Sequence, residues 1–140
     1  METKQIRKRP PAQVPARMVC HGVDDLDFAK LIERTEKSGE DWVKACEELG
    51  NYDFAHAKAE LQKGRRLTAR YFFLAAESLF RIGQYGIHEV TEEKLHLNSK
   101  LCDAFARAAA LFDPPLEEVI AEVFSLAARQ PEPEVARPPA

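Results

Sequence analysis

The segment LTARYFFLAAESLFRIGQ, residues 67–84, is the most informative part of the sequence about the fold. On an α-helix its charged and amide side chains share one narrow stripe with the preceding arginine, and apolar side chains cover more than half of the circumference. The stripe consists of Arg66, Arg70, Glu77, Arg81 and Gln84. Phe73 and Phe80 border it, one heptad apart. So wide an apolar arc predicts a helix that is central to its fold, or one that meets a partner through Phe73 and Phe80.

Capping residues predict further helices on both sides of this stretch. Asp24 is a favourable N-cap, and we expect its helix to extend through Lys37. Thr91 opens a later helix, which we expect to reach about Phe112 and to stop at the following Pro114–Pro115. The long apolar stretch is thus predicted to have helices before and after it in the chain.

The segment just before the long helix is expected to form two helices. Ser38 resembles the start of a capping box and would open a short helix that Gly50 ends. Asn51 or Asp53 would cap a second helix, which ends at Gly64. Glycine is the usual residue just after a helix, because it adopts the left-handed conformation without strain.

The end of the chain carries one more helical pattern. This last helix is expected to start near Leu116. Its apolar positions are Val119, Ile120, Val123, Phe124 and Ala127. No segment alternates polar and apolar residues as a strand in a hairpin does. The sequence therefore predicts an all-α fold, a single compact bundle of about six helices with disordered N- and C-terminal tails.

The two ends differ in composition from the middle of the chain. Residues 1–20 are expected to be a basic flexible tail, because they combine Lys and Arg with prolines and few apolar residues. Residues 130–140 are expected to be a Pro-rich flexible tail. Residues 21–129 would then be the helical domain. A length of 140 residues fits this single domain.

Composition excludes several classes of protein. The formal net charge is −3, so nucleic acid is not expected as a partner, apart from a contact with the basic tail. No apolar run has the length of a membrane helix, and no secretory signal precedes the domain. The cysteines are odd in number and far apart, which favours reduced thiols: Cys20, Cys46 and Cys102. We therefore expect a soluble cytoplasmic protein.

No catalytic or cofactor motif stands out. No serine lies in a nucleophile elbow, and the scattered glycines form no phosphate loop. On one continuous helix His88, Glu92 and His96 would share a face and could bind zinc. Because Thr91 is the expected helix start, His88 falls in the preceding loop and a solvated charged face is the preferred interpretation. We expect no metal and no cofactor.

The long helix also suggests a ligand pocket. Glu77 lies in an apolar helix beside Arg81, which indicates either a surface ion pair or a charged group that faces a cavity. In the second case, Tyr71, Arg81 and Tyr85 are the candidate ligand-binding residues. Glu77 and His88 are the candidate catalytic residues, since a histidine or a desolvated glutamate can move a proton near neutral pH.

Several short motifs resemble a known family. They are Asp41–Trp42, 59–64, 69–71, Ala75–Ala76–Glu77, 94–97, Phe105 with Ala108–Ala109, and Pro114–Pro115–Leu116–Glu117. Over residues 22–120 the chain resembles the N-terminal helical lid domain of the α/β-hydrolases related to fermentation-respiration switch esterases and 2,6-dihydroxypseudooxynicotine hydrolase. A second, weaker resemblance is to tetratricopeptide repeats, although the segment from Tyr85 to Lys94 does not fit a 34-residue period.

The first resemblance implies a function without supplying an active site. In that family the lid covers a C-terminal catalytic domain, helps to form the substrate pocket and belongs to proteins that tend to dimerise. The Ser, Asp and His of the triad lie in the catalytic domain, so none is carried over to this chain. The resemblance implies an all-α, stand-alone lid-like module.

Two functions follow as hypotheses. The first is an accessory or binding module that forms a homodimer or docks a separately encoded hydrolase-like subunit, and that could hold a hydrophobic small molecule. Its candidate interface residues are Phe73, Phe80, Val123 and Phe124. The alternative is a small enzyme without a triad, which acts on a hydrophobic metabolite in a helical pocket by general acid/base chemistry.

Overall fold

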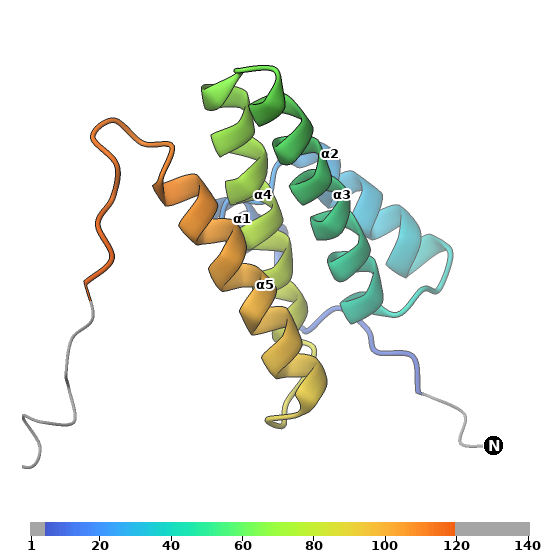
Figure 1. Cartoon of the computed structure of the whole chain (residues 1–140). Coiled ribbons are helices and arrows are strands. Elements are labelled where there is room, and N and C mark those ends of the chain that lie inside the picture. The colour runs from blue at the N-terminus through green and yellow to red at the C-terminus, as the bar shows by residue number, and fades with distance from the viewer. Residues whose placement is uncertain (1–4, 120–140) are drawn as a thin grey trace, which may run out of the picture.

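The body of the protein consists of long helices that lie antiparallel to one another, with Arg66–Gln84 in the middle. The computed structural model describes residues 5–119, and within that range every regular element is a helix. The long helices are α3 (Trp42–Gln62), α4 (Arg66–Gln84) and α5 (Glu92–Ala109), which run up, down and up in Figure 1. α4 packs against α3 on one side and α5 on the other. The predicted all-α bundle is confirmed, and residues 67–84 do form its central helix.

Short polar side chains start the helices. Asp24 accepts a hydrogen bond from the backbone N–H of Asp27 at 2.8 Å and so caps α2 (Asp25–Ile32), as predicted. Thr91 accepts one from Lys94 at 3.2 Å and caps α5. The cap of α3 is Asp41 rather than the predicted Ser38, which follows a π-helical turn, Glu33–Lys37, at the end of α2.

Gly50 does not end a helix. α3 continues through it to Gln62, so the two helices predicted before Gly64 are one. Gly50 is instead where α4 comes closest, because a Cβ at this position would lie 2.6 Å from Cε1 of Phe80. A glycine inside a helix thus makes the hollow that the Phe80 ring fills. Gly64, with φ of +76°, follows the end of α3 as predicted.

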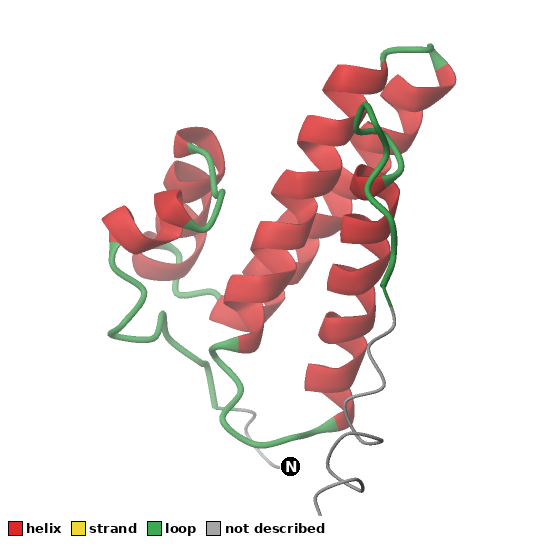
Figure 2. Ribbon diagram, turned by 90° about the vertical axis from the view of Figure 1, so that its left-hand side faces the viewer, coloured by secondary structure: helices red, strands yellow, loops and turns green. Residues whose placement is uncertain are grey.

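Part of the predicted N-terminal tail packs against the bundle. Residues 15–20 form a short helix, α1 (Pro15–Cys20), which lies with α2 beside the long helices (Figure 2). Met18 is fully buried, and its side chain joins the core around Trp42. Val23, which follows α1, is buried in the same core cluster.

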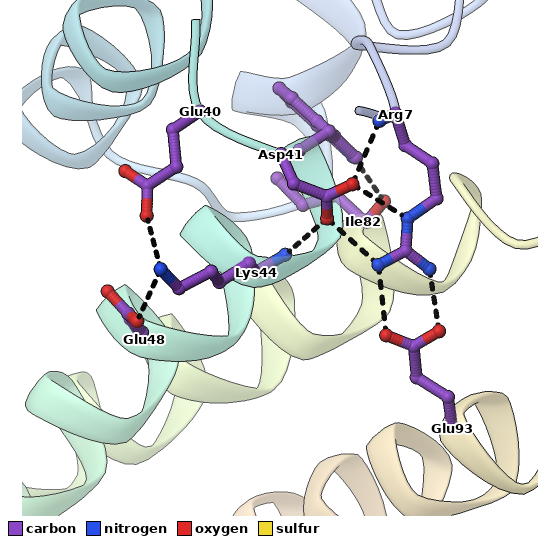
Figure 3. A network of polar contacts seen from close by, with 8 residues as sticks. Arg7, Glu40, Asp41, Lys44, Glu48, Ile82 and Glu93 are labelled. Carbon is purple, nitrogen blue, oxygen red and sulfur yellow. Dashed lines mark hydrogen bonds and ion pairs between the residues drawn. The ribbon is translucent and has the colours of Figure 1, made fainter. Parts of the chain in front are cut away.

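Arg7 ties the N-terminal segment to two of the long helices. Its guanidinium donates to both carboxylate oxygens of Asp41, at 2.9 Å each, and to both of Glu93, at 2.6 and 2.9 Å (Figure 3). Its backbone N–H also donates to Asp41 at 2.8 Å. Such bidentate pairs are among the stronger hydrogen bonds in proteins. Asp41 therefore caps α3 and holds the preceding segment at the same time.

The predicted interface residues of α4 lie in the core. Phe80 packs with Trp42, whose indole N–H donates to the backbone carbonyl of Ile82 at 3.2 Å. Phe73 packs edge-on against Phe54, with ring centroids 5.2 Å apart. Both phenylalanines are at most 1% exposed, so neither offers a surface to a partner in this structure. Their place beside the polar stripe is explained by α3 and α5, which cover α4 from two sides.

The chain turns back after α5. Leu111 is buried against α4, and Leu116 donates its N–H to the carbonyl of Ala109 at 3.1 Å, so that residues 110–119 fold back beside α5 (Figure 1). Residues 116–119 are not helical, whereas the last predicted helix was expected to start there. Val123 and Phe124 lie outside the described residues. Within residues 5–119, no helix has the length and apolar character needed to cross a bilayer.

Candidate functional site

A large apolar groove runs along α5. It has a volume of about 820 Å³ and lies between α4, α5 and the returning segment 115–118. Leu101, Phe105 and Leu116 are large apolar side chains that line it. Phe105 is 45% and Leu116 49% exposed, although both are large apolar side chains. A concave apolar surface of this size falls within the range of small-molecule sites, roughly 300–1,000 Å³.

An ion pair forms the polar end of this groove. Glu77 and Arg81, one turn apart on α4, both line it and bind to each other. Glu77 is 4% exposed, so its carboxylate lies at the floor, whereas the Arg81 side chain is 40% exposed and reaches the rim. Glu77 therefore forms the expected ion pair with Arg81 and also lines the groove.

Glu77 has capacity to accept a further hydrogen bond. One oxygen, Oε1, is bound by Arg81, and the nearest polar contact of the other, Oε2, is Ser78 Oγ at 3.5 Å. That hydroxyl has one proton, and the carbonyl of His21, at 2.7 Å, is its nearest acceptor. Oε2 therefore keeps capacity for one more donor, which would not have to break the Glu77–Arg81 pair.

A second, smaller hollow lies between α2, α3 and α4. It has a volume of about 320 Å³, and carboxyl groups line it beside aromatic rings. Asp27 and Asp53 face each other there and are 4% and 2% exposed. Lys30 forms a hydrogen bond with Asp27 at 3.2 Å. Among the described residues no group donates to Oδ2 of Asp53.

The environment of this pocket raises the pKa of one of its carboxyl groups, Asp53. Burial raises the pKa of Asp53 to about 8, and the nearby negative charge of Asp27 adds to the effect. A proton retained by Asp53 can be donated to Asp27, which satisfies the buried oxygens. Near neutral pH Asp53 therefore retains a proton, because burial and the adjacent negative charge both oppose its ionisation.

Tyr71 belongs to this second pocket and not to the groove. Its hydroxyl donates to Asp24 at 2.6 Å, and this bond raises the pKa of Tyr71 to about 12. Burial opposes ionisation of Asp24, but the bonds from Tyr71 and from the backbone N–H of Asp27 outweigh it and lower its pKa. Tyr71 is therefore held as a neutral donor at the rim of the pocket.

The other predicted site residues lie apart from both hollows. Tyr85 follows α4 and lies against His21, with ring centroids 6.2 Å apart. His88 lies in the loop before α5, as predicted, and is exposed. Of the two candidate catalytic residues, Glu77 lines the groove and His88 does not. Within residues 5–119 no group of three or more His, Cys, Asp or Glu side chains could hold a metal ion.

Asp53 is the residue that the sequence interpretation missed. It was considered only as a helix cap, because Gly50 was expected to end the preceding helix. In a continuous helix Asp53 follows Trp42, Cys46 and Leu49 on the buried stripe of α3. An acidic residue on an apolar stripe is the signal that would have found it. No protein-family model, curated protein or solved structure matches the chain.

Proposed function

We propose that the chain is a binding module, and that its groove along α5 holds an apolar small molecule whose polar end donates a hydrogen bond. The observation that supports this most is the buried carboxylate of Glu77 on the floor of an otherwise apolar groove. Apolar walls supply affinity, and one placed acceptor orients the ligand.

The charges of the groove define the ligand further. Glu77 is already paired with Arg81, so a ligand carboxylate would have to compete with Glu77 for the guanidinium. Glu117 and Glu118 also line the groove and repel an anion. A phenol, an alcohol or another donor meets neither obstacle, because it bonds to Oε2 of Glu77 and leaves the ion pair in place.

A lid-like accessory role is compatible with this proposal. The family that the chain resembles uses its helical domain to help form a substrate pocket, and the groove would be the corresponding surface. The proposal places the ligand in the groove of one chain, so that a second copy or a hydrolase-like subunit is not needed to complete the site.

The test compares two probes of nearly the same shape. 4-Butylphenol carries a donor, and 4-butylanisole replaces it with a methoxy group that cannot donate. Isothermal titration calorimetry should show that 4-butylphenol binds about tenfold tighter, since an unmade hydrogen bond to a charged group costs roughly 1.5–3 kcal/mol. Equal affinities would contradict the role of Glu77.

Paired variants of α5 locate the site. Phe105→Glu places a charge in the groove and should abolish binding, whereas Leu95→Glu makes the same kind of change at a 58% exposed position outside the groove and should not. If both variants bind like the unchanged protein, the ligand is elsewhere. If sedimentation shows a dimer that Phe105→Glu dissociates, the occupant is a second copy and the small-molecule proposal fails.

A further inference from the structure

The pocket between α2, α3 and α4 contains more carboxyl groups than cations. Asp24 and Asp27 come from the start of α2, and Asp53 comes from the middle of α3. Lys30 is the cationic side chain that lines the pocket with them. Its hydrogen bond goes to Asp27, and its side chain is 46% exposed.

Asp53 is the member of this group with a buried oxygen that no donor reaches. It is 2% exposed and lines the pocket, and among residues 5–119 no donor bonds to its Oδ2. A buried carboxylate oxygen without a donor is strongly unfavourable. The site has two ways to satisfy it: Asp53 takes up a proton, or a cation with hydrogen-bond donors enters the pocket.

The walls of the pocket fit an organic cation better than a metal ion. The rings of Phe72 and His56 pack edge-on, with their centroids 4.3 Å apart. The other aromatic rings of the wall are those of Tyr52 and Tyr71. An ammonium group already lies over one ring, since Lys30 Nζ is 5.7 Å from the centroid of Tyr52. Carboxylates beside aromatic faces are the combination that binds substituted ammonium ions. The volume of about 320 Å³ suits a small one.

We propose that this pocket binds a small organic ammonium ion, which donates hydrogen bonds to Asp53 and packs against the aromatic wall. The ligand replaces the proton on Asp53, which leaves for the solvent. Charge is conserved, because one ammonium ion enters as one proton departs. The inference does not rest on the proposed function, since the groove is lined by other residues of α4 and α5.

The exchange of a proton for the ligand makes binding depend on pH. The pKa of Asp53 is about 8, so below that value each ligand must displace a proton, and affinity should rise about tenfold for each unit of pH. Above it the dependence should disappear. The other charged or titratable groups that line the pocket with Asp53 are Asp24, Asp27, Lys30, Tyr52, His56 and Tyr71. A variant of Asp53 separates its contribution from theirs.

Benzylamine is the probe, and benzyl alcohol is its uncharged counterpart. Titration calorimetry of the full chain at about pH 6 and about pH 7, where the amine carries its proton, should show binding of benzylamine but not of benzyl alcohol. Titrations in two buffers with different ionisation enthalpies count the protons released, and we expect about one per ligand. Equal binding of both probes, or binding without proton release, would overturn the proposal.

Asp53→Asn tests the residue itself. The asparagine side chain has almost the shape of the acid and can donate to Asp27, so the fold should be kept. We expect weaker binding by about tenfold or more near pH 8, and no release of protons. Asp103→Asn, which removes a carboxylate from the exposed face of α5, should change neither. An Asp103 variant that loses as much affinity would overturn the proposal, because a general effect of charge would then explain binding.

Two comparisons keep this inference separate from the proposed function. Phe105→Glu should leave benzylamine binding unchanged, and Asp53→Asn should leave 4-butylphenol binding unchanged. If Asp53→Asn fails to fold, the proton count and the pH dependence of the unchanged protein still decide the matter. If the affinity for benzylamine did not change between about pH 6 and about pH 7, the exchange of the Asp53 proton for the ligand would be refuted.

Discussion

Replacing Asp53 with asparagine should remove a large pH dependence from the stability of the protein. In the folded chain Asp53 retains its proton up to a pKa of about 8, because it is buried beside Asp27. In the unfolded chain it ionises around its ordinary value of 3.8. Between these values the unfolded chain binds one proton fewer than the folded chain, so the free energy of unfolding falls as pH rises.

The magnitude follows from the width of that window. Each pH unit within it costs about 1.4 kcal/mol, so the contribution of Asp53 should fall by about 3 kcal/mol between about pH 5 and about pH 7. This contribution of Asp53 to stability is fully present below pH 3.8, and it is lost as the pH rises through about 8. Asparagine resembles the protonated acid at every pH, so Asp53→Asn should be the more stable protein near pH 7.

Urea denaturation measures this difference. The free energies of unfolding of the unchanged protein and of Asp53→Asn are compared at about pH 5, 6 and 7, and their difference should grow with pH. Asp103→Asn is the control and should remain parallel to the unchanged protein, because its carboxylate is exposed on α5. Parallel curves for Asp53→Asn would refute the assignment of a buried proton to Asp53.

Three further substitutions test the packing of the core and the ion pairs of Arg7. Gly50→Ala should destabilise the protein by about 1–3 kcal/mol in urea denaturation, because its Cβ would meet the Phe80 ring at 2.6 Å; a stabilised variant would show that the close contact is wrong. Phe73→Ala should cost about 3–5 kcal/mol and leave the sedimentation coefficient unchanged, since the ring is fully buried; a changed oligomeric state would instead support the interface predicted from the sequence. Arg7→Ala should lower the free energy of unfolding by about 1–2 kcal/mol, and Lys8→Ala, at an exposed position, by almost nothing; equal losses would contradict the bidentate pairs.

Helix identity could be predicted from the sequence wherever local signals agreed. Asp24 and Thr91 are caps with an apolar pattern behind them, and both start helices in the structure. The helix end predicted at Gly50 is wrong, because the tertiary contact with Phe80 overrides the preference of glycine for helix ends. Met18 could not be predicted to pack, since nothing local indicates that it reaches the core around Trp42.

The candidate site was predicted in part. The helical period alone places Glu77 and Arg81 on one face, but it leaves open whether they form a surface ion pair or face a cavity. The helical period places Phe73 and Phe80 beside the polar stripe, but it does not show which neighbouring helices cover them. An interface was therefore a possible interpretation. Asp53 was missed because its burial depends on α3 being continuous and on α2 lying across it.

The reactivity of Cys102 reports on whether a ligand occupies the groove along α5. Cys102 is exposed and lines the groove, whereas burial raises the pKa of the Cys46 thiol well above its usual range and makes it unreactive. In a Cys20→Ser background, modification by a disulfide reagent therefore reports on Cys102. We predict that saturating 4-butylphenol slows this modification and that 4-butylanisole at the same concentration slows it less. An unchanged rate, with 4-butylphenol bound as judged by calorimetry, would contradict the claim that the groove is the binding site.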